Sequence, residues 1–292
     1  MASAIPFRRV AIVGTGLIGG SFALALRKHF PSIRIVGFSR SDSATRAVAR
    51  GAVHEATADL ALAVRGADLV YLATPIGASM EALSVIPKHA EPTALVTDAG
   101  STKTAICRVA KEYFRGGALF LGGHPMAGKE QSGIEHAAAE LFLDAPYVLM
   151  GTEATADSRA LQFADVVRAI GARPVWSDPD THDWAVGIVS HLPQLAAIAL
   201  ARVVQDETDE TGLPLSLAGS GLQDSLRLAG SPYGVWRDIL LTNTDNVSRA
   251  LDRLAQAIDY LRTHLQSKDL EAEFAGANEL YKQLRKPIYD RY

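Results

Sequence analysis

The chain has 292 residues, more than the roughly 100–200 of a typical domain, so we expect two domains, each with its own core. Hydrophobic residues make up 48% and charged residues 21%, which excludes a disordered or fibrous chain. The formal net charge is −3 and the 29 lysines and arginines are spread along the chain. This balance disfavours nucleic acid or an anionic membrane as a partner and favours a small-molecule substrate.

Cysteine content and hydropathy indicate the compartment. The single cysteine, Cys107, forms neither an internal disulfide nor a zinc cluster, which fits a reducing compartment. Residues 1–9 lack the basic start, apolar core and cleavage site of an export signal. Apolar segments are interrupted by Gly, Pro, His or Arg before they reach the length of a membrane span. We therefore expect a soluble, cytoplasmic protein.

Short β-branched runs alternate with Ala-rich amphipathic stretches between Val10 and Trp176. This alternation is typical of βαβ units, so residues 1–179 are predicted to form a doubly wound, Rossmann-type α/β domain with a parallel sheet. The expected strands are Arg8–Val13, Ile33–Phe38, Leu69–Ala73, Ala94–Thr97, Ala118–Leu121, Tyr147–Met150 and Arg173–Trp176.

Strand-like runs cease after the cluster Ser177-Asp178-Pro179-Asp180, and helical periodicity continues to Leu284. We place a domain boundary near Asp180 and predict an all-α domain at residues 180–292. Helices are expected at Thr181–Gln205, Gly234–Leu265 and Lys268–Arg285, with an irregular Gly-rich loop from Thr208 to Pro232. Because the apolar faces of such helices need a partner surface, we predict a homodimer formed through this domain.

A glycine-rich turn, Gly14-x-Gly16-Leu17-Ile18-Gly19, follows the first expected strand and opens a helix. The first glycine permits the tight turn, the second lets the backbone approach a pyrophosphate, and the third lets the helix pack closely on the strand. The N–H groups at the start of the helix are then free to bind phosphate. We interpret these residues as cofactor-binding; a purely structural turn is the alternative.

The second expected strand ends at Ser39-Arg40-Ser41, where an NAD-selective site usually presents Asp or Glu to the ribose 2′-hydroxyl. No acid stands there. The hydroxyls and Arg40 offer hydrogen-bond donors and positive charge to a 2′-phosphate, which favours NADP. An Arg40 that is solvated or only stacks on adenine would leave NAD as the cofactor.

Two further turns follow expected strands at the edge where a doubly wound sheet meets its ligand. Thr74-Pro75 follows the strand at Leu69–Ala73 and is predicted to touch the cofactor, although a plain strand-ending turn would look the same. Ser101 lies in the segment Asp98–Lys103, in the same crevice. Its hydroxyl either serves the reaction or caps the helix that follows.

The segment Gly122-Gly123-His124-Pro125-Met126-Ala127-Gly128 places a histidine between glycines and a proline at the carboxyl end of a strand. An imidazole titrates near neutrality and can accept a hydroxyl proton as hydride leaves the same carbon. We interpret His124 as a general base. The alternative is a structural or solvated turn histidine.

The helical domain supplies fewer candidates. His191 interrupts an apolar helix and is either a substrate ligand or a satisfied core histidine, whereas Arg227 is either a clamp for a carboxylate or a surface charge. Trp236-Arg237-Asp238 needs only a structural explanation, as an aromatic anchor with a local ion pair, and Lys129-Glu130 stays undecided between a gate and a solvated pair. We find no Ser-His-Asp motif and no metal-ligand spacing.

Taken together, these motifs closely resemble the prephenate/arogenate dehydrogenase family of tyrosine biosynthesis over nearly the whole chain. The specific part is the His124-Pro125-Met126-Ala127-Gly128 turn combined with His191-Leu192-Pro193 and the Leu226–Asp238 segment of the helical domain, since the glycine turn alone fits many dehydrogenases. The resemblance implies oxidative decarboxylation of a cyclohexadienol with hydride transfer to a nicotinamide.

The resemblance also implies residue roles. His124 matches the histidine that takes the proton from the ring hydroxyl, and Ser101 the serine that hydrogen-bonds this hydroxyl. Arg227 matches the arginine that holds a substrate carboxylate, and Glu130 an acidic residue that guards the site. Many relatives have a second histidine where this chain has Gln194, whose amide would suit an amino-acid or a pyruvyl side chain, so prephenate and arogenate both stay open.

Two other readings remain. One is a different two-domain dehydrogenase of the β-hydroxyacid type, which the His-Pro-Met-Ala-Gly turn disfavours. The other is a non-catalytic NADP-sensing or scaffold protein that kept the cofactor fold.

Overall fold

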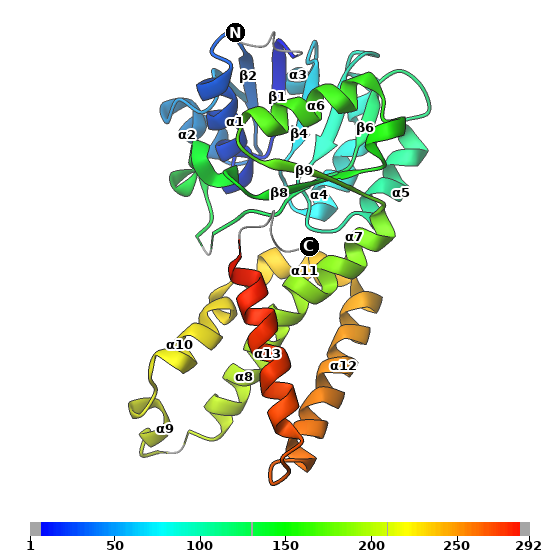
Figure 1. Ribbon diagram of the computed structural model, residues 1–292. Coiled ribbons are helices and arrows are strands. Elements are labelled where there is room, and N and C mark those ends of the chain that lie inside the picture. The colour runs from blue at the N-terminus through cyan, green and yellow to red at the C-terminus, as the bar shows by residue number, and fades with distance from the viewer. Residues whose placement is uncertain (1–6, 130, 209, 287–292) are drawn as a thin grey trace. The chain divides into compact units, whose positions relative to one another are not determined.

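A computed structural model describes residues 7–129, 131–208 and 210–286 (Figure 1). The chain forms two compact units, residues 1–244 and 245–292, which are described in turn. The first contains the expected Rossmann-type sheet and the helices up to residue 242. The domain boundary expected near Asp180 stays a prediction.

A six-stranded parallel sheet is the centre of the first unit and confirms the doubly wound fold. The strand order is β3-β2-β1-β4-β5-β6, so the direction of winding reverses between β1 and β4. The strands are β1 (Arg9–Val13), β2 (Arg34–Phe38), β3 (Glu55–Thr57), β4 (Leu69–Leu72), β5 (Leu95–Asp98) and β6 (Leu119–Leu121). The sequence did not indicate β3, because it is three residues long, partly exposed and without a β-branched run.

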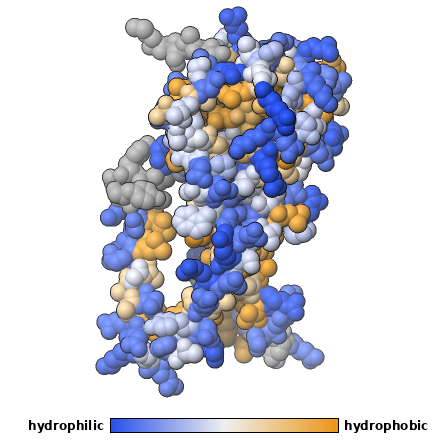
Figure 2. Space-filling model, turned by 90° about the vertical axis from the view of Figure 1, so that its right-hand side faces the viewer, coloured by the Kyte–Doolittle hydropathy of each residue, from blue (hydrophilic) through white to orange (hydrophobic). Residues whose placement is uncertain are grey.

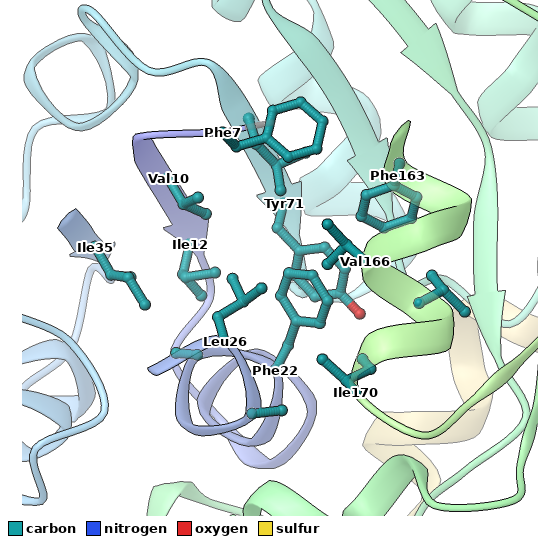
Figure 3. Close-up of a cluster of buried hydrophobic side chains, with 14 of the residues drawn as sticks. Phe7, Val10, Ile12, Phe22, Leu26, Ile35, Tyr71, Phe163, Val166 and Ile170 are labelled. Carbon is teal, nitrogen blue, oxygen red and sulfur yellow. The ribbon is translucent and has the colours of Figure 1, made fainter. Parts of the chain in front are cut away.

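Helices cover both faces of this sheet because successive strand residues point to opposite sides. Val10 and Ile12 belong to a core with α1 and α6, where the rings of Phe22 and Tyr71 stack at a centroid distance of 3.9 Å (Figure 3). Ala11 belongs to the opposite core, with α3, α4 and α5. These helices are α1 (Leu17–His29), α2 (Ser43–Ala49), α3 (Leu60–Val64), α4 (Ile76–Leu83), α5 (Thr104–Tyr113) and α6 (Ser158–Ala169).

Two of the expected strands, Tyr147–Met150 and Arg173–Trp176, do not extend the parallel sheet. They correspond to β8 (Pro146–Met150) and β9 (Arg173–Ser177), which form a separate sheet with β7 (Gly123–Pro125), a strand that the sequence did not indicate. In this sheet β8 and β9 are parallel, whereas β7 and β8 are antiparallel. The expectation of one continuous parallel sheet is therefore wrong here. Only Gly122 separates β6 from β7, and short 3₁₀ turns (Ile134–His136 and Ala139–Phe142) connect β7 to β8. Among the described residues between β7 and β8, no α-helix carries the chain back in parallel.

The helical part of the first unit begins where the sequence signals it, at Asp178, whose carboxylate accepts the N–H groups of Asp180 and Thr181. The expected helix Thr181–Gln205 is α7 (Pro179–Val186), a π-helical turn η5 (Gly187–His191) and α8 (Leu192–Asp206). By length and composition alone, this stretch of 28 residues could cross a membrane, a test that core helices of soluble proteins also pass.

The segment from Thr208 to Pro232 is more regular than expected. It contains α9 (Leu213–Ser216), α10 (Ser220–Leu226) and the 3₁₀ turn η6 (Arg227–Gly230), followed by α11 (Tyr233–Thr242). The expected helix Gly234–Leu265 is interrupted at Asn243, whose side-chain amide donates to the Asp183 carbonyl oxygen at 2.8 Å. This tertiary hydrogen bond has no signature in local periodicity.

The second unit consists of α12 (Thr244–Thr263) and α13 (Leu270–Arg285). Both helices expose large apolar side chains, and Figure 2 shows hydrophobic surface among hydrophilic residues. The exposed side chains include Ile258, Leu261, Phe274, Leu280 and Leu284. Two helices alone cannot bury apolar faces of this extent. A helical unit with such exposed faces gains stability when a partner surface covers them.

Candidate active site

The glycine turn has the geometry that its spacing predicts. Gly14 adopts φ +96°, a conformation that favours glycine. A Cβ atom on Gly19 would lie 1.9 Å from the carbonyl oxygen of Gly14, whereas one on Gly16 would meet nothing within 4 Å. Helix α1 begins after Gly16 without a side-chain cap, so the N–H groups of its first turn, at Leu17 and Ile18, lack intrahelical acceptors. The turn is thus open to an anion.

A cavity of about 660 Å³ lies at the carboxyl ends of β1 and β2. Gly14, Ser39, Arg40 and Ser41 line it. The Arg40 side chain is 82% exposed, and its guanidinium lies 4.0 Å from the carboxylate of Glu81, which lines the same cavity from α4. Ser39 Oγ accepts the Ser41 N–H at 3.1 Å, which holds the loop in a compact turn. The end of β2 offers hydroxyls and a cation, as the sequence indicated.

A second cavity, of about 430 Å³, shares Thr74 and Pro75 with the first. Gly16, Leu17 and Ile18 of the glycine turn and Ser101 of the loop after β5 also line it. Helix α5 begins only at Thr104, so Ser101 does not cap it. The turns after β1, β4 and β5 therefore border one hollow at the topological switch point, where doubly wound sheets bind their ligands.

Asp238 of α11 lies on the wall of the second cavity. Its Oδ2 accepts the N–H of Gly77 in α4 at 2.9 Å, and its Oδ1 accepts Arg237 Nε at 3.0 Å. The local ion pair expected from the sequence is present. The hydrogen bond to α4 was not expected, and it fastens the helical segment to the cofactor side of the cavity.

His124 lies on β7, and only 8% of the residue is exposed. Its Nδ1 is 2.9 Å from Nε2 of His182 in α7, and His182 Nδ1 is 2.8 Å from Asp183 Oδ1. Both partners are also buried. Burial, and then electrostatic interactions with His182, Lys103 and His191, hold the pKa of His124 well below 6.5, so the imidazole is neutral and competent to accept a proton.

A buried ion pair holds the strand that carries His124. The ammonium group of Lys103 donates to Asp98 Oδ2 and to the Gly123 carbonyl oxygen, the latter at 2.7 Å. Asp98 Oδ1 in turn accepts the Gly123 N–H at 3.1 Å. The N–H and the carbonyl oxygen of Gly123, the residue before His124, are thus both hydrogen-bonded to this ion pair. These bonds fix the backbone position from which the His124 side chain projects.

The candidate site residues of the helical segment and the predicted gate residue Glu130 are not all found in one place. His191 is buried, bonds Asn243 Nδ2 through Nδ1 at 3.1 Å and meets the Trp236 ring edge-on. Gln194 is also buried, and its Nε2 has no hydrogen-bond partner among the described residues. Arg227 is exposed on η6 and does not line either cavity, and Glu130 lies outside the described residues. Their roles in substrate binding stay predictions.

Buried neutral histidines make the fold sensitive to acid. Burial lowers the pKa of His191 to about 4 and contributes most to the low pKa of His124. The unfolded chain protonates both near pH 6.5 and so binds more protons than the folded chain below that pH. We expect the free energy of unfolding to fall, by up to about 1.4 kcal/mol per pH unit for each histidine, as the pH drops from 6.5 toward 4. Denaturant unfolding at pH 7, 6 and 5 measures this; equal stability at all three would contradict it.

His182 and Asp183 were not among the site residues predicted from the sequence. They lie 58 and 59 positions after His124, and their neighbours Asp178, Pro179 and Asp180 form a helix start, which explains polar residues without a site. The signal available in the sequence was an adjacent His-Asp pair at the start of the largely apolar helix expected at Thr181–Gln205.

Family models cover most of the chain. The model for the nucleotide-binding domain of prephenate dehydrogenase matches residues 22–176, and the model for the dimerization domain of the same enzyme matches residues 178–285. The chain belongs to the prephenate dehydrogenase family. A prephenate dehydrogenase from Bacillus subtilis is 33% identical over 91% of this chain and 72% of its own length.

Solved structures of this family share the fold closely. Prephenate dehydrogenase from Aquifex aeolicus, in complex with hydroxyphenyl propionate and NAD+, has a TM-score of 0.85 and 28% identity, and the match covers 97% of this chain and 99% of that one. Arogenate dehydrogenase from Synechocystis has a TM-score of 0.80 and 33% identity, with 94% and 99% covered. The chain is accordingly a dehydrogenase with a nucleotide-binding domain of the NAD(P) type.

Proposed function

We propose that the chain catalyses the oxidative decarboxylation of prephenate or arogenate, with hydride transfer to NAD(P), in tyrosine biosynthesis. The observation that carries this proposal is the buried, neutral His124, whose side chain is hydrogen-bonded to His182. In the same unit, the glycine turn and Ser101 line one cavity. Membership of the prephenate dehydrogenase family supports it.

The proposed reaction assigns each group a task. His124 accepts the proton of the ring hydroxyl, and Ser101 hydrogen-bonds that hydroxyl. The C–H bond at the same carbon supplies the hydride, for which NAD(P) is the acceptor. The bond to the ring carboxylate then breaks, its electron pair enters the ring, and carbon dioxide leaves as the ring becomes aromatic. Arg227 holds a remaining substrate carboxylate, and Glu130 guards the entrance.

We propose that residues of the helical segment determine which of the two substrates is bound. Prephenate carries a pyruvyl side chain and arogenate an amino-acid side chain. The buried amide of Gln194, which has a free donor among the described residues, suits either of them, and His191 lies one helical turn before it. We expect reduction of nicotinamide when prephenate, arogenate or both are added with NAD or NADP. Absorbance of the reduced nicotinamide in the four combinations tests this, and absence of turnover in all four would refute the proposed function.

We further propose that NADP is preferred. Support comes from Ser39, Arg40 and Ser41 on the wall of the larger cavity. Loss of one charge-assisted hydrogen bond costs roughly 1.5–3 kcal/mol, so Arg40→Ala should lower kcat/KM for NADP about 10- to 100-fold and leave that for NAD nearly unchanged. Steady-state kinetics with both cofactors measures the change. The exposed Arg108→Ala serves as the control, and an equal loss for both cofactors would argue against a 2′-phosphate contact.

The assembly is proposed to be a homodimer of 31.1 kDa chains, supported by the match of residues 178–285 to a dimerization domain and by the exposed apolar side chains of α12 and α13. A domain boundary near Asp180 and a cytoplasmic location are proposed with it.

A further inference from the structure

His124 is one end of a buried series of hydrogen bonds that ends at Asp183. Two short contacts make up the series, His124 Nδ1 to His182 Nε2 at 2.9 Å and His182 Nδ1 to Asp183 Oδ1 at 2.8 Å. A neutral imidazole donates from one ring nitrogen and accepts at the other. The distances therefore leave two directions of donation, and the surroundings of the carboxylate decide between them.

The backbone around Asp183 fixes that end as an acceptor. The N–H of Lys103 donates to Asp183 Oδ1 at 2.7 Å, and the N–H of Thr104 donates to Oδ2 at 2.9 Å. Burial raises the pKa of Asp183, but the hydrogen bonds from His182, Thr104 and Lys103 outweigh it and hold the pKa below its usual value. The group is a carboxylate and can only accept, so the proton between it and His182 lies on His182 Nδ1.

The rest of the series follows from this end. With its proton on Nδ1, a neutral His182 has a lone pair on Nε2 and accepts a hydrogen bond there. The only donor that this contact provides is Nδ1–H of His124. The proton of His124 then occupies Nδ1, and the lone pair remains on Nε2.

We propose that Asp183, acting through His182, sets the tautomer of His124 so that Nε2 is the basic atom. Both are positioning residues, since the role requires contact with neither substrate nor cofactor. The inference rests on the proposed function of His124 as the base. When Nε2 takes the hydroxyl proton, the Nδ1–H bond to His182 persists, and the Asp183 carboxylate stabilises the imidazolium without taking a proton itself.

Two other readings of the series are weaker. Among residues 7–129, 131–208 and 210–286, no group of His, Cys, Asp and Glu is arranged to hold a metal ion. A protonated His182 would reverse the series, because its Nε2–H would donate to His124 Nδ1. A neutral His124 that accepts at Nδ1 would carry its proton on Nε2, which leaves no basic ring nitrogen on the residue proposed as the base.

Nuclear magnetic resonance of the ¹⁵N-labelled imidazoles tests the tautomer without substrate, and so independently of the proposed function. The signals are assigned from their loss in His124→Asn and His182→Gln. We expect wild-type His124 to show a protonated Nδ1 and an unprotonated Nε2, with the same pattern for His182. A proton on Nε2 of wild-type His124, or a doubly protonated His182 near neutral pH, would overturn the proposal.

Kinetics of two variants separate positioning from mere support of the fold. His182→Leu removes the acceptor and should lower kcat about 10- to 100-fold, with the substrate KM and the cofactor Kd unchanged. His182→Gln keeps a carbonyl oxygen as acceptor and should recover most of the loss. The exposed His89→Asn serves as the control. Equal losses in the Leu and Gln variants, or wild-type kcat in both, would refute the role; should His182→Leu not fold, the wild-type spectrum still decides.

Discussion

Replacing His124 by asparagine is expected to lower kcat about 100- to 10,000-fold, the range that general-base catalysis contributes. Asparagine approximates the size and hydrogen-bonding polarity of the imidazole but cannot accept a proton at neutral pH. It therefore removes the base with little change in shape. The loss should appear in kcat with every substrate and cofactor that the wild-type chain turns over, in steady-state and single-turnover kinetics.

Binding of the cofactor is expected to survive this change. His124 lines neither of the two cavities at the glycine turn, so the Kd for NAD(P), measured by fluorescence or calorimetry, should stay within a few-fold of wild type. The exposed His89→Asn serves as the matched control and should have wild-type kcat. Turnover by His124→Asn within a few-fold of wild type would eliminate the assigned role.

Replacing Lys103 by methionine is expected to have the largest effect on stability. The side chains of Lys103 and Asp98 are both 0% exposed, and the ammonium group also holds the Gly123 carbonyl oxygen. Methionine fills the space but leaves the carboxylate of Asp98 buried, with the N–H groups of Gly100 and Gly123 as its remaining hydrogen-bond partners in the described part of the chain. Breaking a buried pair in this way costs about 3–5 kcal/mol of unfolding free energy.

An exposed ion pair provides the comparison. Lys28 and Glu140 are 2.7 Å apart with side chains 56% and 55% exposed, so Lys28→Met should cost only about 0–1 kcal/mol. Guanidinium unfolding followed by circular dichroism measures both variants. The double variant Lys103→Met with Asp98→Asn removes the stranded charge and should regain part of the loss. If Lys103→Met lost no more unfolding free energy than Lys28→Met, the stabilising role of the buried Lys103–Asp98 ion pair would be contradicted.

The sequence predicted the parts of the fold that depend on local pattern. The run Val10-Ala11-Ile12-Val13 and the glycine turn after it predicted β1 and α1, because alternate faces of a buried strand and a glycine-only turn both have local signatures. The short strand Glu55–Thr57 and the separate sheet that begins at Gly123 had none. Pairing partners far along the chain determine both of them.

Part of the candidate site could also be predicted from the sequence. His124 and Ser101 stood out because each follows a glycine near the carboxyl end of an expected strand, where a doubly wound sheet meets its ligand. Lys103 stood within a recognised motif, but its role depends on contact with Asp98 and Gly123, which only the fold brings about. His182 and Asp183 were missed because the partner that gives them meaning lies 58 and 59 residues earlier.

In the proposed reaction, oxidation by this chain is coupled to decarboxylation. The most direct measurement is the amount of carbon dioxide released per NAD(P)H formed when the wild-type chain acts on prephenate or arogenate. We expect a ratio of one, with both products abolished together in His124→Asn. Reduction of the cofactor without release of carbon dioxide would contradict it and would place the chain with dehydrogenases that only oxidise a hydroxyl group.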